Sequence, residues 1–252
     1  MIAPMRNHDS QSEWITGKGA LTIAGTKVEL EVTVPANPVR LTKMLPIFQQ
    51  LTNAVVDVGV SNAEAKGEQI SCTKGCGACC RQLVPLAESE AYQLQELVNA
   101  MPEPRRATIG ARFAAAKEQL QQTNLLTKIL FPGELSVEAK RRLGLEYFQQ
   151  GIACPFLEDE SCGIHPDRPL ACREYLVTSP AANCAAPSAE TVQCVEMPGS
   201  VSRVVQKLTA TRAVTWLPLI LALDWADEHA DQAPLRAGPE WLQTVFKQLT
   251  NQ

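Results

Sequence analysis

Residues 72–80 read CTKGCGACC, which places four cysteines within nine residues. The chain contains nine cysteines in all. The remaining ones follow in a second stretch: Cys154, Cys162, Cys172, Cys184 and Cys194. A thiolate is a soft, charged ligand that binds zinc or iron strongly. Several thiolates converge only where the backbone turns sharply, and Gly75 and Gly77 reach positive φ without steric cost. The pattern therefore predicts a thiolate metal centre.

The spacing inside the first stretch adds detail to this prediction. Cys76 and Cys79 are separated by two residues, the spacing of a metal knuckle. Cys79 and Cys80 are adjacent, and neighbouring side chains of an extended segment point in opposite directions. The pair can therefore serve two metals or two faces of one cluster. A thioredoxin-type redox motif lacks its βαβ setting here, and inert buried thiols need no glycine-spaced clustering.

Composition narrows the class of protein. The chain has 252 residues, of which 45% are hydrophobic and 20% charged, an ordinary globular mixture that excludes general disorder. The net charge of −4 argues against a dedicated binder of polyanions, which needs clustered lysine and arginine. We therefore expect no nucleic-acid partner. Nothing in the sequence identifies a protein partner.

The start of the chain and its longest apolar run bear on compartment. Residues 1–14 lack the apolar region of a secretory signal. The apolar run over 213–223 is shorter than the roughly 20 residues of a membrane span, and Pro218 interrupts it, so we expect a buried helix and no membrane partner. An odd number of cysteines in an unsecreted chain does not suit a disulfide framework. We expect a cytoplasmic protein.

Hydrophobic periodicity predicts a mainly α fold with a small N-terminal β-hairpin and an irregular cysteine-rich metal-binding core. Alternating apolar residues predict the hairpin over 20–34. Spacing near 3.6 residues predicts helices over 41–60, 88–101, 105–126, 136–150, 211–229 and 239–249. A short helix is expected over 169–175, where Pro169 suits the first turn. Residues 201–208 suit either a strand or a helix. The helix over 136–150 is expected to carry an apolar face of Val137, Leu143, Leu145 and Phe148.

These elements suggest three regions along the chain. Residues 1–66 are expected to form the N-terminal hairpin and helix. Residues 67–195 are expected to form a cysteine-cluster metal-binding domain. Residues 196–252 are expected to form a C-terminal helical segment that packs on the same core.

The cysteine motifs also carry a family resemblance. Cys72-x3-Cys76-x2-Cys79-Cys80, then Cys154-Pro-Phe-Leu, then the segment from Cys162 to Tyr175 resemble the YkgJ-type cysteine-cluster family. Its members are described as zinc- or iron-chelating proteins, and a flagellin lysine N-methylase is related to them. The resemblance implies these metal ligands: Cys72, Cys76, Cys79, Cys80, Cys154, Cys162, Cys172 and Cys184. It leaves Cys194 over, and members often have tyrosine at the position of His165.

Eight thiolates permit two zinc sites of four thiolates each, or a 4Fe–4S cluster with a zinc site or spare thiols. Four thiolates around one zinc ion leave a local net negative charge. Arg168 and Arg173 fall inside the resembling motif, and we expect them to support the ligands. Lys74 is expected to be solvated, and the carboxylates over 158–160 are expected in a solvated loop.

The resulting functional expectation is a metal-binding cysteine-cluster protein with a thiolate-ligated zinc or iron centre. The alternative is an iron–sulfur-dependent redox or methyl-transfer enzyme related to flagellin lysine N-methylase. Cys72, Cys76 and Cys79 have the spacing of a radical-enzyme cluster, but the repeated strands of the usual α/β barrel are missing. The sequence has no phosphate-binding loop, His-Glu-x-x-His or Gly-x-Ser-x-Gly motif, so it leaves catalysis open. An interaction module shaped by metal is a third possibility.

Overall fold

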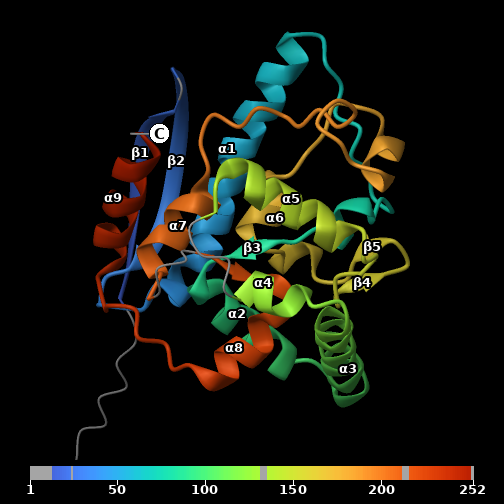
Figure 1. Cartoon of the computed structure of the whole chain (residues 1–252). Helices are drawn as coiled ribbons and strands as arrows, with labels where there is room; N and C mark the ends of the chain where they lie inside the picture. Colours follow the sequence, from blue (N-terminus) through green and yellow to red (C-terminus); the bar gives the residue numbers. More distant parts are fainter. Residues whose placement is uncertain (1–12, 24, 131–134, 212–215, 251–252) are drawn as a thin grey trace, which may run out of the picture.

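The computed structural model describes residues 13–23, 25–130, 135–211 and 216–250. Its architecture is mainly helical, with one long hairpin at the N-terminal side (Figure 1), as the sequence predicts. The α-helices in these ranges are α1 (Leu45–Ala65), α2 (Glu88–Asn99), α3 (Glu103–Gln122), α4 (Leu125–Leu130), α5 (Val137–Phe148), α6 (Leu170–Glu174), α7 (Val201–Thr209), α8 (Ala222–Glu228) and α9 (Gly238–Leu249). Short 3₁₀ helices cover Leu41–Met44, Ala78–Arg81, His165–Asp167, Ala181–Ala185 and Leu219–Leu221.

The strands of the described residues pair into three small antiparallel sheets. They are β1 (Trp14–Ile23) with β2 (Thr26–Pro35), β3 (Pro85–Leu86) with β6 (Leu217–Pro218), and β4 (Leu157–Glu158) with β5 (Ser161–Cys162). In the first sheet, Gly25 adopts φ +82° at the turn, a conformation that glycine reaches without a Cβ clash. The predicted hairpin is confirmed and begins earlier in the chain than residue 20.

The hairpin packs on helices from both ends of the chain. One hydrophobic cluster joins β1 and β2 with α1, α7 and α9, and Figure 1 shows α9 lying along the hairpin. Trp241 of α9 is fully buried in this cluster, and its Nε1 donates a hydrogen bond to the Val39 carbonyl at 3.0 Å. The last helix is therefore tied to the segment that follows β2.

Two further clusters support the cysteine-rich segments. One joins α2, α3 and α8, and it reaches Phe156, which meets Phe113 edge-on with ring centroids 5.5 Å apart. Cys154 and Cys162 pack against this cluster. The other cluster joins α3, α4 and α5. The second cysteine stretch therefore begins on a rigid apolar base, although its own backbone is largely irregular.

The predicted single helix over 211–229 is wrong. Residues 212–215 lie outside the described part of the chain, so the structure tests the apolar run only from residue 216. There, Leu217–Pro218 pairs with β3, and α8 begins only at Ala222. Pro218 lacks the backbone N–H that a helix needs in its interior, which explains why this run starts as a strand.

The predicted apolar face of α5 is also wrong in part. Val137 is 83% exposed and Leu145 is 37% exposed, whereas Leu143 and Tyr147 are buried. Residues four apart share one face of a helix, so Leu143 and Tyr147 form the packed stripe. Residues 201–208, which suited either type of element, belong to α7.

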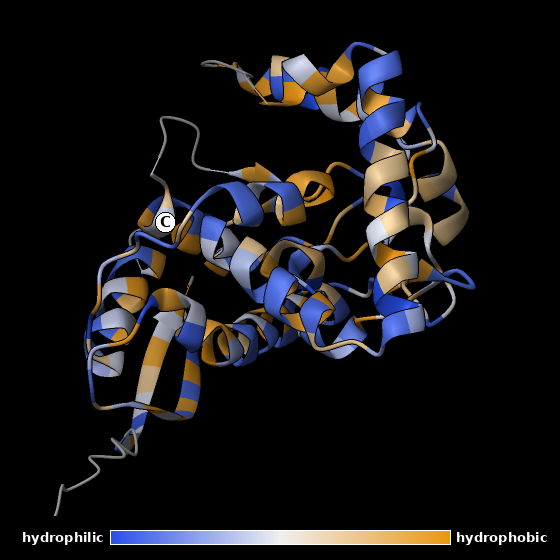
Figure 2. Cartoon of the chain, turned by 90° about the horizontal axis from the view of Figure 1, so that it is seen from below, coloured by the Kyte–Doolittle hydropathy of each residue, from blue (hydrophilic) through white to orange (hydrophobic). Residues whose placement is uncertain are grey.

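Hydrophobic and hydrophilic residues are mixed along most helices, as the colours of Figure 2 show. Among the residues that the structure describes, no helix has both the length and the apolar character that a membrane crossing requires.

Candidate metal centre

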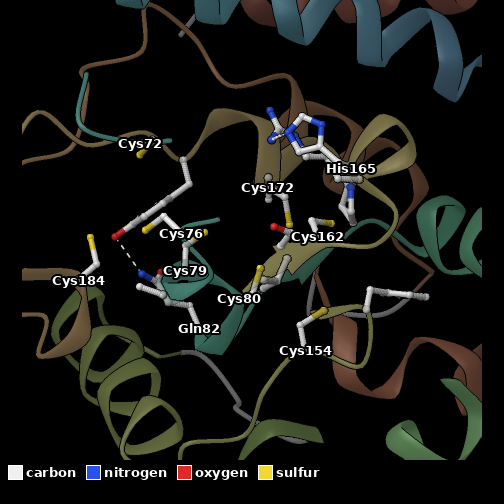
Figure 3. A pocket seen from close by; sticks show the side chains of 18 of the residues that line it. Cys72, Cys76, Cys79, Cys80, Gln82, Cys154, Cys162, His165, Cys172 and Cys184 are labelled. Atoms are coloured by element: carbon white, nitrogen blue, oxygen red, sulfur yellow. Dashed lines mark hydrogen bonds between the residues drawn. The ribbon is translucent and has the colours of Figure 1, made fainter. Parts of the chain in front are cut away.

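The two cysteine stretches meet at one cavity of about 780 Å³, which we call the chamber (Figure 3). Every cysteine expected as a ligand lines it: Cys72, Cys76, Cys79, Cys80, Cys154, Cys162, Cys172 and Cys184. Cys194 is not among the lining residues. The fold thus brings together the residues that the sequence singles out, across a separation of more than 70 positions between Cys80 and Cys154.

Backbone contacts hold the first cysteine stretch against the second. The Cys154 N–H donates to the Cys80 carbonyl at 2.7 Å, at the end of the 3₁₀ helix Ala78–Arg81. On the other side, the Ser71 N–H donates to the Val177 carbonyl at 2.9 Å. The Val177 N–H donates in turn to the Cys72 sulfur at 3.4 Å. Each end of the first stretch is therefore anchored to a different part of the second.

A tight hairpin carries Cys162 to the chamber. Its two turn residues, Asp159 and Glu160, both have positive φ, at 48° and 53°, as a type I′ hairpin turn requires. Arg81 binds both carboxylate oxygens of Glu160, at 3.0 and 2.6 Å. Arg81 therefore occupies the Glu160 carboxylate and fixes the turn beside Cys80.

The two glycines of the first stretch have different roles. Gly75 has φ +88°, so its predicted conformational role is confirmed. Gly77 has φ −90°, so the expectation of positive φ there is wrong. A Cβ at Gly77 would lie 2.6 Å from Glu160 Oε2 and 2.8 Å from Leu157 Cδ1. Position 77 has no room for a Cβ atom, because the β4–β5 turn packs directly on it.

The thiols separate into two groups within the chamber. Figure 3 shows Cys72, Cys76 and Cys184 on one side, which we call the Cys72 group. The opposite side holds the Cys80 group: Cys80, Cys154, Cys162 and Cys172. Cys79 lies between them. The electrostatic neighbours agree with this division, because Cys184 interacts with Cys72 and Cys76, whereas Cys172 interacts with Cys154 and Cys162.

Burial sets the protonation of these thiols. Desolvation raises the pKa of Cys154 to about 12, and it raises the pKa of Cys172 well above its ordinary value. Cys79 is the exception, because the Cys80 thiol donates a hydrogen bond to it, which lowers the pKa of Cys79 and raises that of Cys80. The pKa of Cys79 is therefore lowered, whereas burial favours the protonated thiols of Cys154 and Cys172.

The arginines near the ligands divide into two roles. Arg168 lines the chamber, and its Nε is buried without a hydrogen-bond partner among the described residues. Its charge helps to lower the pKa of Cys79 and counteracts the raised pKa of Cys162. Arg173 donates instead to the Arg168 carbonyl at 3.0 Å, so it holds the loop together. Lys74 is exposed, as expected.

Histidine contributes only at the rim of the chamber. The His165 ring is exposed and contacts the Arg168 guanidinium. Partial desolvation and then the charges of Arg168 and Arg173 lower the pKa of His165. A neutral imidazole at this position is chemically able to bind a metal. The thiols nevertheless make up the main donor set.

Two residues of the site, Gln82 and Glu90, carry no sequence signal. The Gln82 amide donates to the Tyr175 hydroxyl at 2.9 Å, which turns Tyr175 into part of the chamber wall. Glu90 is buried and accepts hydrogen bonds from the Ala87 and Leu170 N–H groups, both at 2.8 Å. The second of these bonds fixes the start of α6, which carries Cys172. No local motif announces such contacts, because each joins segments distant in sequence.

The thiols are gathered but not closed around one point. Among the described residues, no group of three or more His, Cys, Asp or Glu side chains is arranged so that it could hold a metal ion. The donor set nevertheless fits a thiophilic metal, since all eight thiols line one chamber together with Arg168. Ligation by these eight cysteines stays a prediction.

Comparison with known proteins gives a family match for the part of the chain that forms the chamber. Residues 71–195 match the model of the CxxCxxCC family, described as "Putative zinc- or iron-chelating domain". The match begins one residue before Cys72 and ends one residue after Cys194. No curated protein and no solved structure matches the chain. Through residues 71–195, about half its length, the chain belongs to this cysteine-cluster family of zinc- or iron-chelating domains.

Proposed function

We propose that this protein binds zinc or iron through a thiolate centre in the chamber. One observation carries the proposal: two cysteine stretches far apart in sequence place all eight candidate thiols around the same cavity. The proposed ligands are Cys72, Cys76, Cys79, Cys80, Cys154, Cys162, Cys172 and Cys184. The family match supports metal chelation and leaves the choice between zinc and iron open.

The chemistry of the chamber suits this role. The thiols that line the chamber would hold the metal as thiolates, and its binding would release their protons. Four thiolates around a divalent ion leave a net negative charge. The guanidinium of Arg168, which lines the chamber, would offset part of that charge. A bound metal would contribute to folding stability, because it would join the two cysteine stretches.

The test is a Co²⁺ titration of the metal-stripped full chain, in which thiolate ligation gives intense visible and near-ultraviolet absorption. Cys172→Ser and Cys76→Ser should each lose about one bound ion, since a tetrahedral site needs four ligands. Ala171→Ser is the matched control, because it adds a hydroxyl beside Cys172 and removes no thiol. Equal cobalt binding by the wild type and both cysteine variants would contradict the ligand assignment.

An iron–sulfur enzyme is the second candidate, and the size of the chamber favours it. A cavity of about 780 Å³ with apolar walls that include Val84, Phe156 and Leu219 has room for a second molecule beside a metal centre. Cys72, Cys76 and Cys79 have the spacing that holds three irons of a 4Fe–4S cluster and leaves the fourth open. A redox or methyl-transfer reaction with S-adenosylmethionine would then be the activity.

Anaerobic reconstitution with iron and sulfide tests this candidate. A brown chain that cleaves S-adenosylmethionine, and loses that activity in Cys76→Ser, would support it. A colourless chain that takes up only zinc would exclude it.

The free state of all nine cysteines suits a reducing compartment, so we also propose a cytoplasmic location. We further propose that residues 67–195 act as the metal-binding domain between 1–66 and 196–252.

A further inference from the structure

Part of the chamber lining carries no thiol. Val84, Phe156, Ile164 and Leu219 line the cavity and pack in the hydrophobic cluster that joins α2, α3 and α8, and we call them the apolar wall. Two backbone hydrogen bonds fix this wall: the Leu219 N–H donates to the Val84 carbonyl at 2.9 Å, and the Gly163 N–H donates to the Phe156 carbonyl at 2.8 Å. Apolar surface that lines an open cavity gains free energy when an apolar ligand covers it.

The same cavity is lined by a cation that has no carboxylate partner among the described residues. Arg168 contacts the His165 ring through one guanidinium nitrogen, and the ion pairs found in the described part of the chain do not include it. The Arg168 Nε–H is buried without a hydrogen-bond partner there. Because an unpaired buried donor costs free energy, a ligand that places an acceptor at this nitrogen would be stabilised.

Arg168 and the apolar wall lie on the same side of the chamber. Ile164 of the apolar wall directly precedes the 3₁₀ helix His165–Asp167, and Arg168 directly follows it. Burial raises the pKa of Cys162, and the charge of Arg168 counteracts this rise. Cys162 in turn packs against the hydrophobic cluster that contains the apolar wall. One small molecule can therefore contact the guanidinium and the apolar wall at once.

The other charges near Arg168 favour an anionic ligand. Arg173 is 6% exposed, and its guanidinium donates to two backbone carbonyls and one amide side-chain oxygen, all of them neutral. Asp167 and Glu90 offset part of the Arg173 charge. Glu160 is a carboxylate of the chamber lining, and it is already held in its ion pair. Arg168 therefore keeps a positive charge that a ligand can neutralise.

The size of the chamber fits a small organic molecule. Its volume of about 780 Å³ falls within the roughly 300–1,000 Å³ of ligand pockets, which combine apolar walls with a few polar groups. The planar guanidinium of arginine matches the geometry of a carboxylate. One guanidinium balances one negative charge, which favours a monocarboxylate over a doubly charged phosphate ester.

We propose that the chamber also binds a small organic carboxylate, with its carboxylate group on Arg168 and its apolar body on the apolar wall. This binding site shares the chamber with the proposed metal centre but goes beyond metal binding. It needs no metal, because neither of its two contacts involves a thiol. The ligand binds without any covalent step.

Isothermal titration of the reduced, metal-stripped full chain with octanoate tests the proposal. Octanamide has the same apolar body without the charge, so it should bind at least about tenfold more weakly than octanoate. Hexanoate should bind about 16-fold more weakly, since each of the two missing methylenes contributes about a factor of four. These comparisons use the wild-type chain, so they do not depend on whether a variant folds.

Variants of the two cations in the lining locate the carboxylate. Arg168→Gln should weaken octanoate binding by at least about tenfold, and Arg168→Lys should recover part of the loss, since it keeps the charge without the planar fork. Lys74→Gln is the matched control, because it removes one positive charge from an exposed position of the same lining. It should change the affinity by less than about twofold.

The outcomes separate this proposal from the proposed function. Equal binding of octanoate and octanamide, or equal losses in Arg168→Gln and Lys74→Gln, would overturn the carboxylate site and leave metal binding intact. A chain that takes up neither zinc nor iron but binds octanoate through Arg168 would overturn the proposed function and leave the carboxylate site standing.

Discussion

Gly77→Ala probes the contact that holds the two cysteine stretches together. The new Cβ would lie 2.6 Å from Glu160 Oε2, 2.8 Å from Leu157 Cδ1 and 3.2 Å from the Glu160 Cα. The two side-chain atoms can move, but the Glu160 carboxylate then leaves Arg81, and the backbone contact requires a shift of the turn by a few tenths of an ångström. Overpacking of this kind typically costs about 1–3 kcal/mol. We expect a loss of stability within that range.

Urea unfolding with linear extrapolation measures this loss. Gly110→Ala in α3 is the control, because no heavy atom lies within 4 Å of its added Cβ. Alanine is the better helix former, so the control should gain up to about 1 kcal/mol. The shifted turn also carries Cys162 away from Cys80, so Gly77→Ala should bind cobalt less tightly in the Cys80 group. An unfolding free energy equal to or above that of the wild type would refute the steric reasoning.

Three further variants test separate parts of the structure. Arg168→Gln removes a cation whose charge helps to lower the pKa of Cys79. In metal-stripped protein, the pH midpoint of Cys79 alkylation should therefore move upward. An unchanged midpoint would show that the guanidinium does not act on this thiol. Burial raises the pKa of Glu90 to about 7 from an ordinary 4.5, so the stability linked to its proton is present at low pH and is lost as the pH rises through about 7. Glu90→Gln should therefore flatten the fall in unfolding free energy between about pH 5 and about pH 8, and a parallel pH profile would contradict the assignment. Trp241→Ala should cost about 3–5 kcal/mol in urea unfolding, since the side chain is fully buried against the hairpin, and a loss below about 1 kcal/mol would show that α9 is not anchored there.

Local patterns in the sequence predicted most elements of the fold. Alternation of apolar residues found the hairpin, because a strand places successive side chains on opposite faces. Helical spacing found α1, α2, α3 and α9 with ends shifted by a few residues. The same reasoning failed at Leu217–Pro218, where pairing with β3 from a distant part of the chain replaces helix formation. Periodicity reports the preference of a segment and contains no information about its partner.

In the candidate site too, local sequence patterns predicted some features, whereas contacts between distant segments could not be predicted. Cysteine clustering predicted a thiolate centre, and the family resemblance implied the eight residues that the fold gathers around one chamber. The spacing could not show that Gly77 is needed for space, that Gln82 holds Tyr175, or that Cys194 lies across Val177 from Cys72. These features arise only when segments far apart in the chain come into contact.

Metal analysis with an absorption spectrum, on full-length protein purified without oxygen, tests the central claim most directly. The account predicts metal bound through thiolates. A colourless chain should contain about two zinc ions, and a brown chain should contain iron with acid-labile sulfide. A chain that holds neither metal, takes up neither on reconstitution, and presents all nine cysteines to a thiol reagent would contradict the account.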